Sequence, residues 1–110
     1  MPSATYKLFR EAMFAERQVH CTYDGHPREL CPVILGYSDG DEKVLAYQVG
    51  GSSSKSLSHE GEWKCLRLAK IHNPTMRDGP WREGGQHSQM QSCIREVDID
   101  INIHVRKRRR

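Results

Sequence analysis

The sequence lacks most of the short motifs by which catalytic sites are recognised. It contains no CxxC pair, no phosphate-binding P-loop, no GxGxxG turn and no GxSxG nucleophile elbow. It also lacks an apolar run of the roughly 20 residues that a membrane-spanning helix needs. We therefore expect neither an enzyme nor a membrane protein.

The N-terminal segment lacks the long apolar stretch of an export signal, because residues 1–18 read MPSATYKLFREAMFAERQ. Cytoplasmic glutathione opposes stable disulfides. We therefore expect a cytoplasmic protein whose four widely spaced cysteines, Cys21, Cys31, Cys65 and Cys93, are reduced. Cys21 and Cys31 lie in apolar strand patterns, where a thiol packs as a small hydrophobic group.

A net positive charge is absent outside the C-terminal end, although the formal net charge of the chain is +3. Residues 1–105 contain twelve Lys and Arg and all 14 Asp and Glu, so their net charge is −2. A uniformly basic face for duplex DNA is therefore not predicted. We expect one domain over residues 1–105 and a basic tail, and two interpretations of the tail stay open. It is a solubilising end, or it binds phosphates weakly and salt-sensitively through Arg106, Lys107, Arg108, Arg109 and Arg110.

The pattern of apolar residues predicts a mainly β domain. One amphipathic helix is expected near residues 3–18, capped by Ser3 or Thr5. Alternating or apolar runs then predict strands over 19–23, 29–37, 43–49, 63–71 and 93–105, with a hairpin turn at Asp39-Gly40, a loop over 50–62 and an irregular segment over 72–92. This order favours a strongly bent antiparallel sheet or barrel of about five strands with one N-terminal helix.

The expected last strand has one apolar and one polar row. Val97, Ile99, Ile101, Ile103 and Val105 alternate with Asp98, Asp100, Asn102 and His104. Successive members of the polar row would sit roughly 6.6 Å apart, too far for all four to hold one ion. We interpret the row as a solvated face and predict no metal site.

A set of polar and aromatic side chains on the middle strands is suited to anions. It comprises Tyr23, Arg28, Tyr47, Gln48, Ser53, Arg67 and Lys70. Aromatic rings stack on bases, and Arg and Lys neutralise phosphates. Arg67 lies between Leu66 and Leu68, so we expect its guanidinium to be partly desolvated and to need an anion. The alternative stays open that the tyrosines are core-edge residues and that Arg67 is a surface cation.

The order of several segments resembles that of a WYL domain. These segments are YKLFREAMFAERQVHCTY up to Tyr23, RELCP at 28–32, KVLAYQVGG at 43–51 and WKCLRLAKI at 63–71. The resemblance implies an Sm-like or SH3-like barrel with an N-terminal helix, which senses ligands in bacterial transcription regulators. It implies nucleotides or nucleic-acid fragments as ligands, and by position it makes Tyr23, Arg28, Tyr47, Arg67 and Lys70 the pocket candidates.

The chain departs from that family at several positions. The naming Trp-Tyr-Leu tripeptide reads Lys43-Val44-Leu45, the phenylalanine of the later motif is Leu66, and its second arginine is Lys70. Strand alternation would place Arg67 and Lys70 on opposite faces, unless the strand ends between them. One helix also leaves no room for a helix-turn-helix.

Our hypothesis is a non-catalytic module, without a cofactor, that binds a nucleotide or short single-stranded nucleic acid in bacterial regulation. The alternative is a protein-interaction module, a homodimer or an accessory to a transcription regulator, without a nucleic-acid ligand.

Overall fold

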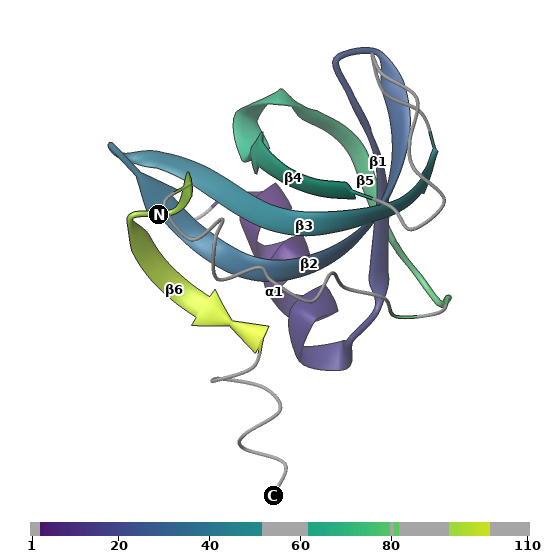
Figure 1. The fold of residues 1–110 in the computed structure, drawn as a ribbon, viewed down its shortest axis with the longest axis horizontal. Coiled ribbons are helices and arrows are strands. Elements are labelled where there is room, and N and C mark those ends of the chain that lie inside the picture. The colour runs from purple at the N-terminus through teal and green to yellow at the C-terminus, as the bar shows by residue number, and fades with distance from the viewer. Residues whose placement is uncertain (1–2, 52–61, 80, 82–92, 102–110) are drawn as a thin grey trace, which may run out of the picture.

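The computed structural model describes residues 3–51, 62–79, 81 and 93–101, and these form one helix and one sheet (Figure 1). The helix is α1 (Ala4–Ala15), and the short 3-10 helix η1 spans Leu68–Lys70. The strands are β1 (Gln18–Tyr23), β2 (His26–Ser38), β3 (Asp41–Gly51), β4 (Glu62–Arg67), β5 (Ile71–Arg77) and β6 (Glu96–Asp100). The prediction of a mainly β, antiparallel domain with one N-terminal helix is confirmed.

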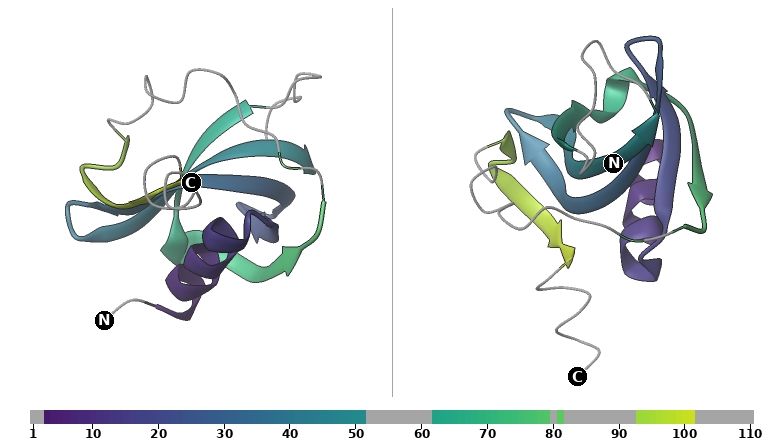
Figure 2. Two further views of the ribbon diagram at one scale, coloured as in Figure 1. Left: turned by 90° about the horizontal axis from the view of Figure 1, so that it is seen from below. Right: turned by 45° about the vertical axis from the view of Figure 1, so that its right-hand side comes forward.

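Helix α1 begins where the sequence placed a capping residue. The Ser3 side chain accepts a hydrogen bond from the Tyr6 amide, which satisfies one of the unpaired amides of the first turn. The helix ends at Glu16, which adopts a left-handed conformation with φ 52°. Its buried face, Tyr6, Phe9, Ala12 and Met13, packs across β1, β2 and β5 (Figure 2).

The sheet has the strand order β4-β3-β2-β1-β5, and β6 pairs with β2. Two tight turns set the register of the first three strands. Asp24-Gly25 joins β1 to β2, and Asp39-Gly40 joins β2 to β3, with all four residues at positive φ. Asp-Gly is a favoured pair for such two-residue hairpins, because glycine carries no Cβ that opposes this backbone conformation. The predicted turn at Asp39-Gly40 is confirmed.

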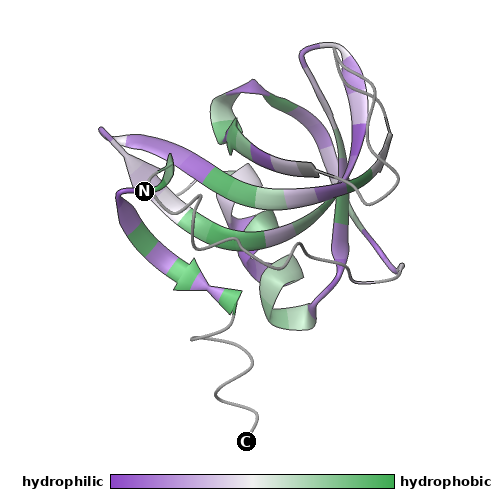
Figure 3. Cartoon of the chain, viewed as in Figure 1, coloured by the Kyte–Doolittle hydropathy of each residue, from purple (hydrophilic) through white to green (hydrophobic). Residues whose placement is uncertain are grey.

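Strand β2 is the centre of the sheet. Its first half pairs with β1, its second half pairs with β6, and β3 runs along its other edge. Residues 30–36 are all buried, which explains their nearly continuous apolar sequence (Figure 3). The register of β2 against β3 shifts between Pro32 and Ile34, beside a proline that cannot donate to a ladder.

The sheet bends strongly but is not closed. Strands β1 and β4 are separated by β2 and β3 in the strand order, yet the Tyr23 hydroxyl lies 3.4 Å from the Arg67 amide. The 3-10 helix η1 then carries the chain from β4 at one side of the sheet to β5 at the other. The bend therefore brings the end of β1 to the end of β4.

The structure corrects two of the expected elements. The strand expected over 63–71 ends at Arg67, where η1 begins. The segment expected to be irregular begins with β5, which brings the described sheet to six strands. Asn73, at φ 53°, and Pro74 interrupt the sequence pattern of β5. Both are tolerated because β5 is an edge strand.

The expected alternation of the last strand is wrong within β6. Ile99 is buried as expected, but Val97 is 46% exposed and Asp100 is buried. The β2–β6 register shifts between Leu35 and Gly36, and this shift breaks the period of two. Asp98 accepts a hydrogen bond from the Tyr6 hydroxyl at 2.5 Å, so it is a contact to α1.

Candidate ligand-binding site

Arg28 is the one buried arginine of the described residues. It lies on β2, opposite Cys21 of β1 and Gly51 of β3, and only 6% of its surface is exposed. Directly paired residues share a face of a sheet. Arg28 therefore points to the same side as Cys21, which is part of the main core.

Few groups accept hydrogen bonds from the Arg28 guanidinium. One terminal nitrogen, Nη1, donates to the Gln48 side-chain oxygen at 3.1 Å, and Nη2 lies 3.5 Å from the Tyr23 carbonyl oxygen. The buried Nε has no hydrogen-bond partner. The ion pairs found within the described residues do not include Arg28. A buried cation without a carboxylate is costly, so this position is suited to an anion.

Tyr23 and Gln48 hold the guanidinium in place. The Tyr23 ring centroid lies 5.3 Å from the Arg28 guanidinium carbon, within the range of a cation–π contact. Gln48 is fully buried, and its side-chain nitrogen donates to the Gly50 carbonyl at 3.0 Å. This bond turns the Gln48 side-chain oxygen toward Arg28. The structure thus brings together three of the sequence-predicted residues: Tyr23, Arg28 and Gln48.

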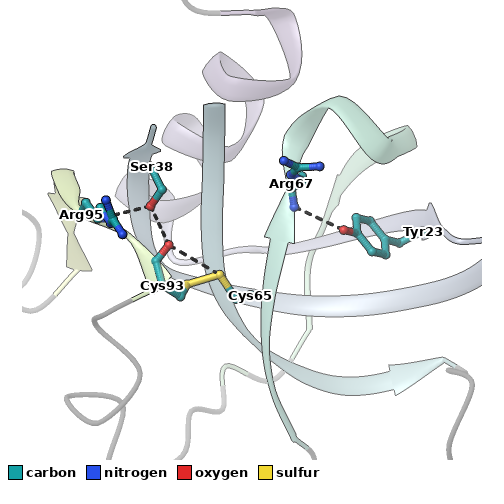
Figure 4. The surroundings of a disulfide bond; sticks show 6 residues. All are labelled: Tyr23, Ser38, Cys65, Arg67, Cys93 and Arg95. Carbon is teal, nitrogen blue, oxygen red and sulfur yellow. Dashed lines mark hydrogen bonds between the residues drawn. A yellow bond between two sulfur atoms is a disulfide. The ribbon is translucent and has the colours of Figure 1, made fainter. Parts of the chain in front are cut away.

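Arg67 does not occupy the semi-dry position that the sequence predicted. Its side chain is 53% exposed and pairs with the similarly exposed Asp41 at 3.1 Å. Strand β4 ends at this residue, so the long side chain reaches the rim of the sheet rather than its interior. The connection to the buried site runs through its backbone, because the Arg67 amide donates to the Tyr23 hydroxyl (Figure 4).

A depression of about 240 Å³ adjoins Arg67. It is lined by Gly40, Asp41, Glu42, Arg67, Ala69 and Lys70. Lys70 lies on the same side as Arg67 because β4 ends between them, the one condition under which strand alternation allows it. The two carboxylates offset the two cations, and Glu42 already accepts bonds from the Ser3 amide and hydroxyl. This depression is therefore less selective for anions than the surroundings of Arg28.

The structure does not bring Tyr47 to Arg28. Tyr47 neighbours Gln48 on β3 and points to the opposite face of the sheet. There its ring contacts the Trp63 ring edge-on, with the two ring centroids 5.1 Å apart. Ser53 and the basic tail, residues 106–110, lie outside the described residues. The sequence also contains one Ser-x-x-Lys spacing, from Ser52 to Lys55, which likewise lies outside them.

The expectation that every thiol is reduced is wrong for one pair. Cys65 of β4 and Cys93, just before β6, form a disulfide (Figure 4). Cys21 and Cys31 are buried and take no part in a disulfide. Burial raises the pKa of the Cys21 thiol from 9.0 to about 11, and the nearby Arg28 charge opposes this only in part. No local pattern signals the pair, because 28 residues separate its members.

A larger hollow, of about 640 Å³, lies along α1 and was not anticipated. It is lined by Lys7, Arg10, Glu11, Phe14 and Ala15. The Arg10 guanidinium lies 5.8 Å from the centroid of the partly exposed Phe14 ring. All its lining residues belong to one helix face of mixed charge, so it offers less specific chemistry than Arg28.

Within the described residues, no three His, Cys, Asp or Glu side chains are grouped so as to hold a metal ion. No helix among them has the length and apolar character to cross a membrane. Comparison of the chain with protein-family models, with curated proteins and with solved structures finds no match.

Proposed function

We propose that this chain is a non-catalytic module that binds an anionic ligand, a nucleotide or a short single-stranded nucleic acid. The observation that carries the proposal is Arg28, a buried guanidinium with an unpartnered Nε and no carboxylate partner among the described residues. A phosphate oxygen would supply the missing acceptor, and charge-assisted bonds of this kind are strong. Tyr23 would present its ring to a base.

Two residues flank Arg28 in the sheet. On β3 its register partner is Gly51, a residue type without a side chain. Tyr23, on its other flank, is only partly buried and stands at the end of β1. Tyr23 also links this cluster to the depression at Arg67 and Lys70, because its hydroxyl accepts a hydrogen bond from the Arg67 amide.

The resemblance to WYL domains supports the same proposal. Two of the three clustered residues, Tyr23 and Arg28, are among those that the resemblance marks as pocket candidates. We also propose that the bent sheet is an Sm-like or SH3-like barrel. Its strand order and the 3-10 helix between the outer strands β4 and β5 support this assignment. A role in bacterial regulation, in the cytoplasm, is proposed from the resemblance alone.

Binding of a short single-stranded oligonucleotide, measured by fluorescence anisotropy at fixed salt, tests the proposal. Arg28→Gln should weaken binding at least about tenfold, because one charge-assisted contact in a dry site contributes roughly 1.5–3 kcal/mol. Arg67→Gln should weaken it less, since Asp41 already pairs with that cation in water. Arg77→Gln, on the outer strand β5, is the matched control and should leave the affinity unchanged. Equal losses from Arg28→Gln and Arg77→Gln would contradict a site at Arg28.

The open sheet favours one alternative, a protein-interaction module. Within the described part of the chain, β4 and β5 each pair on one edge only. Unpaired edges accept further strands. A molecular mass that rises with protein concentration, together with no oligonucleotide binding, would support this alternative and contradict the first proposal.

A further inference from the structure

The four cysteines fall into two chemically separate pairs. Cys65 and Cys93 are bonded to each other and only partly buried. Cys21 and Cys31 are buried and take no part in this disulfide. The high pKa of Cys21 keeps its sulfur protonated at neutral pH, and a protonated thiol does not attack a disulfide. Cys21 therefore does not exchange with the Cys65–Cys93 bond at neutral pH.

The disulfide joins β6 to the rest of the sheet. Cys65 lies in the middle of β4, and Cys93 precedes β6 by three residues. Beside it, the buried Ser38 hydroxyl donates to the Cys93 carbonyl at 2.7 Å and accepts from the Arg95 amide at 3.0 Å (Figure 4). These contacts fix the point from which β6 enters the sheet.

Strand β6 fits the edge of β2 closely but over a short length. Four residue pairs, from Ile34↔Asp100 to Tyr37↔Glu96, make up its ladder. At Gly36 a Cβ would lie 2.0 Å from the Glu96 carbonyl oxygen, so only glycine admits the strand there. Ile94, Ile99 and Ile101 are buried in the core beneath it. Undocking of β6 would expose these side chains and the edge of β2.

We propose that Cys65–Cys93 is a reversible thiol–disulfide switch that controls the docking of β6 on β2. A thiolate of a small or protein dithiol attacks one sulfur, which breaks the Cys65–Cys93 bond and forms a mixed disulfide. The second thiol of the reductant resolves it. The two cysteines together gain two electrons and two protons, and the reductant becomes a disulfide. A disulfide oxidant reverses the reaction.

The surroundings of the pair suit both states. In the oxidised state the Cys65 sulfur carries no proton and simply lies 3.9 Å from the Cys93 carbonyl oxygen. In the reduced state the new thiol has that oxygen as an acceptor. Cross-links between a strand and a distant segment restrict how far the segment departs from the sheet. Reduction therefore removes the covalent restraint on β6. The contacts that still hold it include the four-pair ladder, the isoleucines, Ser38, the Tyr6–Asp98 hydrogen bond and the Arg95–Asp39 ion pair. The cytoplasmic location proposed above would favour such a switch, because cytosolic disulfides are in general transient and catalytic or redox-sensing.

Hydrogen exchange on the full chain tests the switch. Amides of 96–101 should exchange about tenfold faster or more after treatment with dithiothreitol, while amides of β3 should not change. Mass spectrometry must show the gain of two hydrogens in the same sample. Unchanged exchange of 96–101 in protein shown to be reduced would overturn the proposal.

Two variants separate the disulfide from other effects of the reductant. The double variant Cys65→Ser, Cys93→Ser should exchange as fast as the reduced protein with or without dithiothreitol. Cys31→Ala keeps the disulfide and should keep the response. Peptide mapping of oxidised wild-type protein that finds Cys93 alkylated without reduction would also overturn the proposal.

Discussion

At the scale of single residues, Arg28 decides how the proposed site works. The sequence offered several cations, and it favoured Arg67 because leucines flank that residue. The residues that flank a position indicate which face of a strand is apolar, but they do not indicate where the strand ends. Because β4 ends at Arg67, this side chain reaches water, whereas Arg28 lies between two paired strands in the middle of the sheet.

Arg28 has no carboxylate partner in the part of the chain that the structure describes, so its buried charge should cost stability in the absence of a ligand. Arg28→Met keeps a similar length without the charge, so we expect the free energy of unfolding to rise by about 1 kcal/mol while oligonucleotide binding disappears. Urea denaturation of the ligand-free protein measures this. Arg28→Lys, which retains a buried charge, is the matched comparison and should not be stabilised. A strong decrease in the stability of Arg28→Met would show that the guanidinium is satisfied without a ligand.

Cys21 should make stability depend on alkaline pH. Its folded-state pKa of about 11 lies above the ordinary 9.0, so the folded state holds the proton longer than the unfolded chain. The contribution of the protonated Cys21 thiol to the free energy of unfolding is therefore complete below pH 9, and it is lost as the pH rises from 9 to about 11. The decrease should amount to about 2–3 kcal/mol in wild-type protein. Stability should vary less with pH across this range for Cys21→Ala, and an equally steep decline in that variant would exclude Cys21 as the cause.

At the scale of elements, the fit of β6 to β2 depends on one position. Gly36→Ala places a Cβ against the Glu96 backbone, which cannot rotate away, so we expect stability to fall by about 1–3 kcal/mol and exchange in β6 to become faster. Gly50→Ala is the matched control within the sheet. Its Cβ would meet only the Glu29 carboxyl group, the flexible end of a side chain. Equal stability of the two variants would mean that β6 does not dock as described.

Elements with local signals were predicted well. The Ser3 cap and the turn at Asp39-Gly40 each follow from the chemistry of one or two residues. Strand β5 and the altered alternation of β6 were missed. Asn73 and Pro74 are unfavourable in a strand by themselves, and an edge position tolerates them only because the rest of the sheet is in place.

At the scale of the whole molecule, charge is divided between the body and the tail. Residues 1–105 carry −2 and the last five residues carry +5, so long-range attraction to nucleic acid should come from the tail. Replacing the five basic residues of 106–110 by glutamine should reduce the salt dependence of single-strand binding, by about 0.7 in the slope for each phosphate that the tail no longer neutralises. Arg28→Gln should lower affinity with little change in that slope. Complete disappearance of binding after the tail replacement alone would assign recognition to the tail.

By itself the sequence determined the class of the fold, because periodicity, capping and turn chemistry act over a few residues and need no knowledge of distant ones. It also identified Tyr23, Arg28 and Gln48 as candidates, since residue type alone defines what a side chain can bind. Only the tertiary structure decided which arginine is buried and which cysteines meet. Both depend on where strands end and how far the sheet bends, and those properties arise from contacts between residues far apart in the chain.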